Sequence, residues 1–130
     1  PTPADPAQRR AEDTVQRFRA LVEQRYRSQP SMAECAEALG LPASQLNRLC
    51  HRVLGHHALA VLHARLLLEA QRELAYTALS IKQIAFGLGF ADAAYFTRFF
   101  RRMTGLSPRA MRACARAPSG DACAPGSISG

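Results

Sequence analysis

One two-helix pattern occurs twice in this sequence, and the repeat constrains the fold more than any other feature. In residues 81–105, IKQIAFGLGFADAAYFTRFFRRMTG, apolar residues first recur at helical spacing, and a Gly-Phe-Ala-Asp segment then interrupts the helix. The apolar face of the first helix consists of Ile81, Ile84, Ala85 and Leu88. The apolar stripe of the second consists of Tyr95, Phe96, Phe99, Phe100 and Met103. Two short helices joined by a tight glycine turn are therefore predicted.

The same pattern precedes it in residues 32–55, MAECAEALGLPASQLNRLCHRVLG. Before the turn the copies align at an offset of 49, as Leu39 with Leu88, and after it at an offset of 50, as Arg48 with Arg98. The second copy thus has one extra residue in its turn, a change that leaves both helices intact. In each copy the second helix keeps a polar, cationic outer face. The repeat predicts an all-α protein with two helix-turn-helix units, whose second helices suit a DNA major groove.

The charge of the chain is strongly positive and unevenly distributed. Lys plus Arg outnumber Asp plus Glu by 17 to 10, and 16 of those 17 cations are Arg, which binds phosphates and guanine edges bidentately. Between Ala93 and Ala117 there are six Arg and no acidic residue. This distribution favours a nucleic-acid partner. The alternative is a GC-rich genome that encodes Arg in place of Lys on solvated faces.

The sequence offers little for catalysis or metal binding. Cys35, Cys50, Cys114 and Cys123 have no Cys-x-x-Cys spacing, and we expect buried free thiols. The histidines lack the paired spacing of a zinc site, so neither a metal nor a cofactor is expected. Paired carboxylates, a nucleophile with a base and a Gly-rich phosphate loop are all missing, which argues against an enzyme. No apolar run approaches the ~18 residues of a membrane span, and we expect a cytoplasmic protein without a membrane partner.

Composition and helix-capping residues predict the structure of the remaining segments. Residues 1–10 are expected to be a disordered leader or linker remnant, and residues 117–130 a disordered tail. Residues 11–26 carry an amphipathic stripe, which predicts a helix packed on the first unit; a dimerising helix is the alternative. That stripe consists of Ala11, Val15, Phe18, Val22 and Tyr26. Ser31 with Glu34 and Ser80 with Gln83 predict capping boxes, and a last helix is expected over 107–116.

One connecting helix is predicted over residues 56–75, between the first unit (31–55) and the second (80–105). Its apolar stripe consists of Leu59, Leu62, Leu66, Ala70 and Leu74. Twenty residues at the rise of an α-helix extend about 30 Å, which is close to the ~34 Å between successive major grooves on one face of a duplex. A monomer is therefore expected to read two adjacent grooves. A bundle helix of ordinary length is the alternative.

A set of residues within 31–112 forms a recognisable family pattern: Tyr76-Thr77, Ser80-Ile81, Ile84-Ala85, Leu88-Gly89-Phe90, Asp92, Tyr95 to Arg102, Thr104-Gly105 and Ser107-Pro108, with Leu46, Arg48, Gly55, Arg65 and Ala70 upstream. On these residues, the segment resembles the DNA-binding domain of the AraC/XylS family of bacterial transcriptional regulators. The resemblance implies seven helices, arranged as two helix-turn-helix units on a linking helix. It also implies a place C-terminal to an effector-binding, dimerising domain.

The resemblance also implies which positions contact DNA, and these are the outward positions that remain once the apolar stripes are assigned. Base contacts are expected from Ser44, Gln45, Asn47 and Arg48 in the first unit, and from Ala93, Ala94, Thr97 and Arg98 in the second. Phosphate contacts are expected from Arg52, Arg101 and Arg102, and from the helix starts at Ile81 and Pro108 through charge and helix dipole. The alternative for each Arg is a solvated surface cation.

The expected function is a sequence-specific transcription regulator, and activation is implied by the family alone. The expected partners are double-stranded DNA and RNA polymerase, with a monomeric isolated domain and a dimeric full-length protein. A module that docks RNA polymerase, with DNA binding incidental, is one alternative. A repair protein is another, but it would need a reactive thiol in a basic pocket, and Cys35 and Cys50 are expected to be buried.

Overall fold

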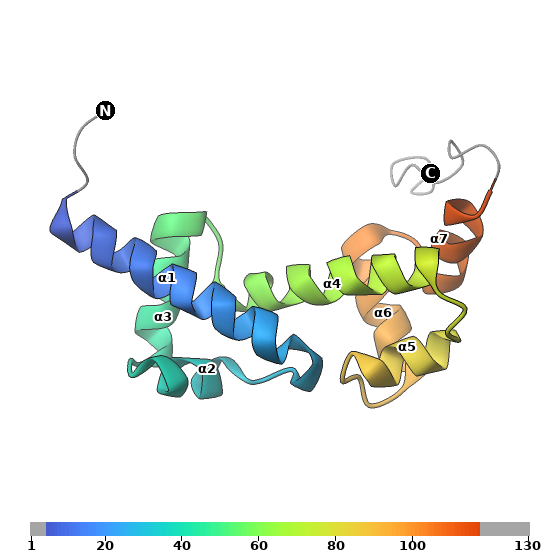
Figure 1. Cartoon of the computed structure of the whole chain (residues 1–130), viewed down its shortest axis with the longest axis horizontal. Coiled ribbons are helices and arrows are strands. Elements are labelled where there is room, and N and C mark those ends of the chain that lie inside the picture. Colours follow the sequence, from blue (N-terminus) through green and yellow to red (C-terminus); the bar gives the residue numbers. More distant parts are fainter. Residues whose placement is uncertain (1–4, 118–130) are drawn as a thin grey trace. The chain divides into compact units, whose positions relative to one another are not determined.

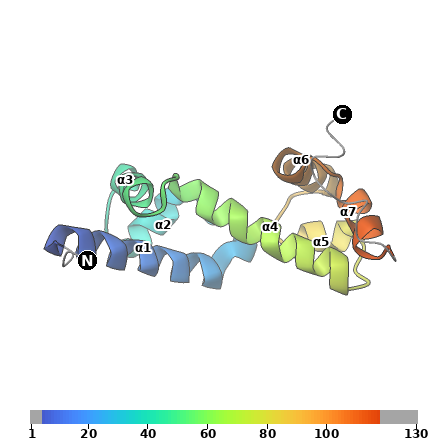
Figure 2. The same cartoon turned by 90° about the horizontal axis from the view of Figure 1, so that it is seen from above.

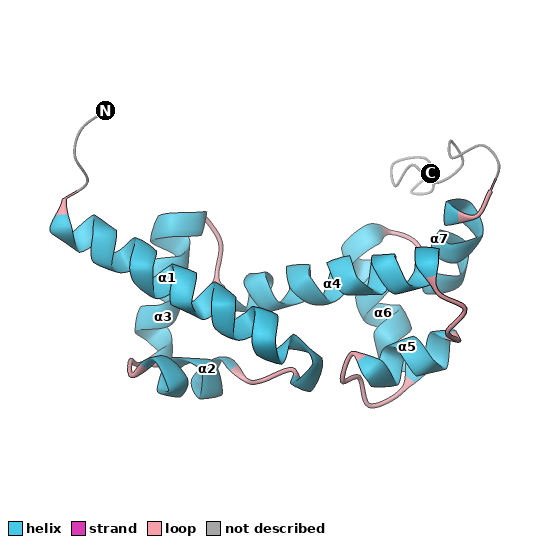
Figure 3. Ribbon diagram, viewed as in Figure 1, coloured by secondary structure: helices cyan, strands magenta, loops and turns pink. Residues whose placement is uncertain are grey.

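The computed structural model describes residues 5–117, and all regular structure in that range is helical (Figure 3). The elements in order are α1 (Pro6–Arg25), a 3-10 turn (Tyr26–Ser28), α2 (Met32–Leu39), α3 (Ala43–Leu54), α4 (Ala58–Tyr76), α5 (Ile81–Gly87), α6 (Ala93–Thr104) and α7 (Pro108–Ala115) (Figure 1). The predicted all-α class with seven α-helices is confirmed for these residues. The chain divides into two compact units, residues 1–65 and 66–130, at a boundary within α4.

The first unit is built around α1, which packs against both α2 and α3 (Figure 1). Every residue of the predicted stripe is buried, including Phe18 at its centre. The two helices on which α1 packs bury residues of their own, Cys35 on α2 and Leu46 and Cys50 on α3. Amphipathic spacing therefore identified both the helix and the face it buries.

The start of α1 differs from the prediction. The helix begins at Pro6, so residues 6–10 are helical where the sequence favoured a disordered leader. Two local features explain the earlier start: the Asp5 side chain accepts a hydrogen bond from the Ala7 amide at 2.7 Å, and proline fits the first helical position. Residues 1–4 and 118–130, which include nearly all of the expected tail, lie outside the described residues.

The second unit forms where α6 packs against α5 and α7 (Figure 2). Phe90, in the turn before α6, lies at the centre of an aromatic cluster, with its ring centroid 5.2 Å from those of both Phe96 and Phe99. The predicted stripe of α6 is only partly correct, because Tyr95 is 52% exposed and Met103 is 40% exposed. The face of α6 that is buried is therefore narrower than the predicted apolar stripe. Tyr95, at the edge of that face, meets the ring of Phe90 in an edge-on geometry.

Helix ends follow the local signals that the sequence carries. Both predicted capping boxes form: Ser31 Oγ accepts from the Glu34 amide and Ser80 Oγ from the Gln83 amide, each at 3.0 Å. Gly40 ends α2 with φ 74°, and a Cβ there would meet no atom within 4 Å. The left-handed backbone, not crowding, therefore favours glycine at this position.

The cysteines fall into two classes. Cys35 and Cys50 are free and buried, as expected. Cys114 on α7 is disulfide-bonded, so the expectation of a free thiol is wrong for this residue. Its spacing from the other cysteines follows no motif, and for that reason no pattern in the sequence indicated the bond. Cys123 lies outside the described residues.

Candidate nucleic-acid interface

The first candidate reading helix is α3. Leu46 and Cys50 turn one side of it into the core, because they lie four residues apart and so on one helical face. The four predicted base-contacting residues of this helix are exposed: Ser44, Gln45, Asn47 and Arg48. Burial of the apolar face therefore leaves these polar side chains on the solvent side of one helix.

Two polar residues of α3 have partners within the first unit. Asn47 Oδ1 accepts the amide N–H of Ala58, the first residue of α4, at 2.8 Å. Arg52 Nε donates to Gln8 Oε1 on α1 at 2.8 Å. Sequence periodicity could not reveal either bond, because the partners belong to other helices. Arg52, predicted to contact phosphate, also joins α3 to α1.

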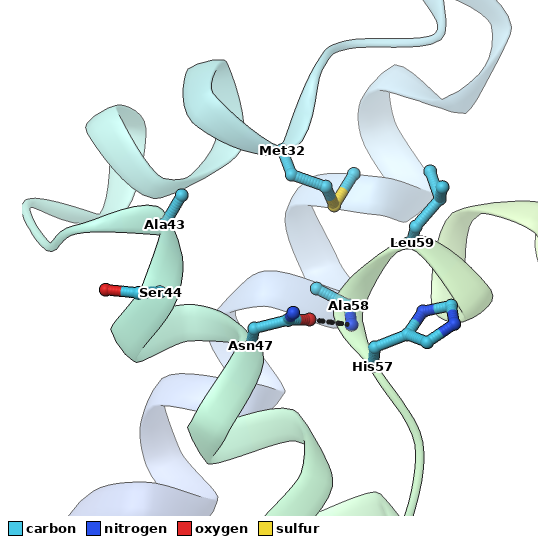
Figure 4. Close-up of a pocket in the computed structure, with 7 residues that line it drawn as sticks. All are labelled: Met32, Ala43, Ser44, Asn47, His57, Ala58 and Leu59. Atoms are coloured by element: carbon cyan, nitrogen blue, oxygen red, sulfur yellow. Dashed lines mark hydrogen bonds between the residues drawn. The ribbon is translucent and has the colours of Figure 1, made fainter.

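A hollow of about 350 Å³ borders this helix, and Figure 4 shows the side chains that line it. The lining residues are Met32, Ala43, Ser44, Asn47, His57, Ala58 and Leu59. The side chain of Asn47 points toward Ala58 in this view. The hollow thus lies where α2, α3 and the first turn of α4 meet.

The second candidate reading helix is α6, which begins where Asp92 Oδ1 accepts from the Tyr95 amide at 2.7 Å. With Phe96, Phe99 and Phe100 buried, Ala94 and three arginines remain exposed on the helix. These arginines are Arg98, Arg101 and Arg102. Ala93 and Thr97 are half-buried. Of the predicted contacts on α6, both phosphate contacts are therefore exposed, whereas two of the four predicted base contacts are half-buried.

Tyr95 is a candidate contact that the sequence analysis missed. Its apolar spacing assigned it to the core, yet it is exposed on α6, and the guanidinium carbon of Arg98 lies 5.9 Å from its ring centroid. The ring offers an apolar face and a hydroxyl beside a cation. Tyrosine commonly lies at the edge of a core because its ring is apolar and its hydroxyl polar. This dual character of tyrosine was the only sequence signal that Tyr95 could be exposed.

The two predicted phosphate positions at helix starts are Ile81 and Pro108, the first residues of α5 and α7. Pro108 is buried and, as a proline, has no amide hydrogen to donate. The caps Ser80 and Ser107 already accept the amides of Gln83 and Ala110 at 3.0 Å. Any phosphate contact at these starts therefore depends on the other first-turn amides and on the helix dipole.

Two observations bear on metal and thiol chemistry in the described residues: the grouping of metal-ligating side chains and the burial of the free cysteines. Within 5–117, no three His, Cys, Asp or Glu side chains are grouped as metal ligands. Burial raises the pKa of the Cys35 and Cys50 thiols, which disfavours the reactive thiolate. Over the same range, no helix has the length and apolarity that crossing a bilayer requires.

Comparison with known proteins gives this arrangement a context. A profile of the helix-turn-helix domain family matches residues 35–113. The HTH-type transcriptional activator RhaS of Mannheimia succiniciproducens is 30% identical over 91 residues, which are 70% of this chain and 34% of RhaS. The chain therefore spans about a third of that relative's length.

Solved structures share the fold. The AraC-type DNA-binding-domain regulator from Chromobacterium violaceum superposes with a TM-score of 0.75 at 26% identity, over 84% of this chain and 97% of that one. The DNA-binding domain of AdpA, solved in complex with a target DNA, matches with a TM-score of 0.72 at 25% identity, over 91% of this chain and 99% of that one. With its two helix-turn-helix units and these relatives, the chain belongs to the AraC family of DNA-binding transcription regulators.

Proposed function

We propose that this chain is the sequence-specific output domain of a larger, effector-responsive transcription activator, and that α3 and α6 enter two successive major grooves. The observation that carries the proposal is the repetition, in each unit, of a helix with a buried apolar side and an exposed polar side. Activation is supported by the relative RhaS, which is a transcriptional activator. The segment that matches it is 34% of RhaS, which is consistent with an output role in a longer protein.

The two reading faces offer different chemistry to DNA. Ser44, Gln45 and Arg48 on α3 can donate to or accept from base edges, and an Arg can bind guanine bidentately. On α6 the exposed polar side chain at a predicted base-contact position is Arg98, while Ala94 can contact a thymine methyl. We therefore propose that the first unit supplies more of the base discrimination.

Backbone binding is proposed to come from the exposed arginines at the end of α6, Arg101 and Arg102, and from Arg52 on α3. Each phosphate that is neutralised releases counterions, and about 6 such contacts give a log–log salt slope near −5. Fluorescence anisotropy of a labelled duplex over a range of salt concentrations measures this slope. A slope shallower than about −2 would contradict binding to the DNA backbone as the basis of function.

Sequence specificity is tested by selection from random duplexes followed by sequencing of the bound fraction. Enrichment of a bipartite motif is the expected result. Recovery of unselected sequence would favour the alternative of a module that binds a protein, with DNA incidental.

RNA polymerase is the proposed protein partner of the DNA-bound domain. In the second unit, three large apolar side chains near the end of α4 and along α5 are exposed: Tyr76 by 85%, Phe86 by 52% and Leu79 by 39%. Exposed apolar side chains are a common feature of protein contacts. Transcription in vitro with Phe86→Ala is expected to lose activation while duplex affinity stays unchanged. Equal activation by this variant would contradict the assignment of Phe86 to the contact.

A further inference from the structure

We propose that Asn47 is a positioning residue of the first reading helix and not a reader of bases. Its side chain holds α3 against the first turn of α4, and this bond sets how Ser44, Gln45 and Arg48 are presented to DNA. The inference rests on the proposed DNA-reading function. It concerns how that function is divided among the residues of α3.

The first step is the bond itself. Ala58 begins α4, so its amide has no carbonyl partner within the helix. Asn47 Oδ1 supplies the missing acceptor at 2.8 Å, as Figure 4 shows. Ala58 is only 1% exposed, which limits the access of water to this amide. A buried donor without an acceptor is unfavourable, so the Asn47 side chain is held in this orientation.

The second step is what this orientation removes. An Asn that reads adenine uses both ends of one amide: Oδ1 accepts from the base amino group and Nδ2 donates to the ring nitrogen. In Asn47, Oδ1 is directed to the backbone of α4 instead. That bond occupies one lone pair of Oδ1 and fixes the amide plane against α4, so the side chain is not free to turn both ends of its amide to a base edge while the bond to Ala58 is kept. Exposure of the residue on α3 does not by itself make it a reader.

The third step comes from the second unit, in which each residue after the turn of the first unit has its equivalent 50 positions later. In both units, the residue just before the helix accepts a hydrogen bond from the amide three residues later, which is a local cap. His57 Nδ1 accepts from the Ala60 amide of α4 at 3.3 Å, and Ser107 Oγ accepts from the Ala110 amide of α7 at 3.0 Å. The bond that Asn47 makes to the Ala58 amide has no equivalent in the second unit, because Ala58 is replaced by Pro108, which has no amide hydrogen.

The consequence is that the two reading helices differ at one equivalent position. Thr97 takes the place of Asn47 in α6, and no helix-start amide of Pro108 exists for it to accept. Thr97 is therefore not committed to such a cap and can turn its hydroxyl to DNA. The first unit uses this position to join two helices, whereas the second leaves it available for recognition.

The test combines thermal unfolding with selection from random duplexes, on the full 130-residue chain. Asn47→Ala removes the acceptor and is expected to lower the Tm by about 4–8 °C, as for a lost helix cap. Affinity should fall by one common factor, roughly 5-fold, for all selected sequences, with base preference in the first block unchanged. Gln45→Ala, on the same exposed side of α3, is the matched control and should leave the Tm unchanged.

Two further variants separate positioning from reading. Ala58→Pro copies the second unit and removes the donor, so adding Asn47→Ala should then change the Tm little. Since a proline ring must fit a buried site, Asn47→Asp provides a second route. Its carboxylate still accepts the Ala58 amide and suits a helix start, so the Tm and the base preference should both be retained.

The outcomes are distinct. The inference would be overturned if the wild type enriches a motif and either Asn47→Ala or Asn47→Asp changes the preference at one base pair. Such a change would show that Asn47 reads a base. An unchanged Tm in Asn47→Ala would overturn it as well, since the bond would then hold nothing in place. Absence of enrichment by the wild type would contradict the proposed function instead, whatever the variants show.

Discussion

The guanidinium of Arg65 lies over the ring of Tyr26, with its carbon 4.2 Å from the ring centroid, and its Nε donates to Glu23 Oε2 at 2.5 Å. Tyr26 follows α1 directly, whereas Arg65 belongs to α4. One side chain thus joins the end of the first helix to the connecting helix. Arg suits this role because its planar group can stack and form an ion pair at the same time.

Arg65→Ala is expected to lower the free energy of unfolding by about 1–2 kcal/mol, because both the stacking and the ion pair are lost. The Arg65 side chain is 18% exposed and that of Glu23 is 61% exposed. Glu23→Gln should therefore cost less, below about 1 kcal/mol, since a solvated partner contributes little. Urea unfolding of both variants measures the difference. Equal losses would show that the stacking on Tyr26 contributes nothing.

Arg112 on α7 should stabilise the second unit by capping the carboxyl end of α4. Its Nε donates to Leu74 O at 3.1 Å and its Nη2 to Thr77 O at 3.4 Å. Because carbonyls at a helix end have no partner within the helix, Arg112→Ala should cost about 1–3 kcal/mol in urea unfolding. Arg109→Ala, at an exposed position on the same helix, is the control with no expected loss. Similar stability of the two variants would contradict the capping role.

Arg48 and Arg101 should affect DNA binding in different ways. Arg48→Ala is expected to flatten base preference in the first block, since a bidentate contact is worth roughly 1–3 kcal/mol of discrimination. Arg101→Ala should weaken all sequences alike and reduce the salt slope by about one. Selection and salt titration of both variants provide the readouts. If the second block proves the more constrained and Arg48→Ala keeps its preference, the leading role of the first unit is wrong.

Two successive grooves require a fixed spacing in the site. The two recognition blocks should be centred about 10 base pairs apart, and inserting ~5 base pairs should turn one block to the far side of the duplex. Affinity should then fall to that of a single block. An insertion of ~10 base pairs is the rotational control, since it restores the face while changing the distance. Unchanged binding to the shorter insertion would mean that α4 does not set the spacing.

The buried thiols predict a loss of stability at alkaline pH. Burial raises the pKa of Cys35 and Cys50 above the ordinary value of 9.0, so the folded state favours the protonated form. Their contribution is present below pH 9.0 and is lost as the pH rises toward the folded-state values. Urea unfolding at pH 8 and pH 10 should therefore show a smaller loss in a double Cys35→Ala, Cys50→Ala variant than in the wild type. Equal losses would attribute the alkaline effect to other groups.

Local signals in the sequence determined the helices and most of their ends. The capping boxes at Ser31 and Ser80 formed as predicted, because their partners lie three residues away. The stripe on α1 was also predicted correctly, since helical spacing alone places Val15 and Phe18 on one face. The repeat determined that there are two helix-turn-helix units, since each copy carries its own turn and apolar face.

Only the tertiary structure decided which outward side chains are already engaged. Asn47 and Ala58 are 11 residues apart, and Arg112 and Leu74 are 38 apart, so no helical period relates them. The exposure of Tyr95 likewise depends on how far Phe90 and the neighbouring rings cover α6. Periodicity assigns a residue to a side of its own helix, because it reflects the backbone geometry of that helix alone. Which atoms meet across helices depends on the packing of the whole unit. That packing brings the side chain of Asn47, on α3, to the backbone amide of Ala58 at the start of α4.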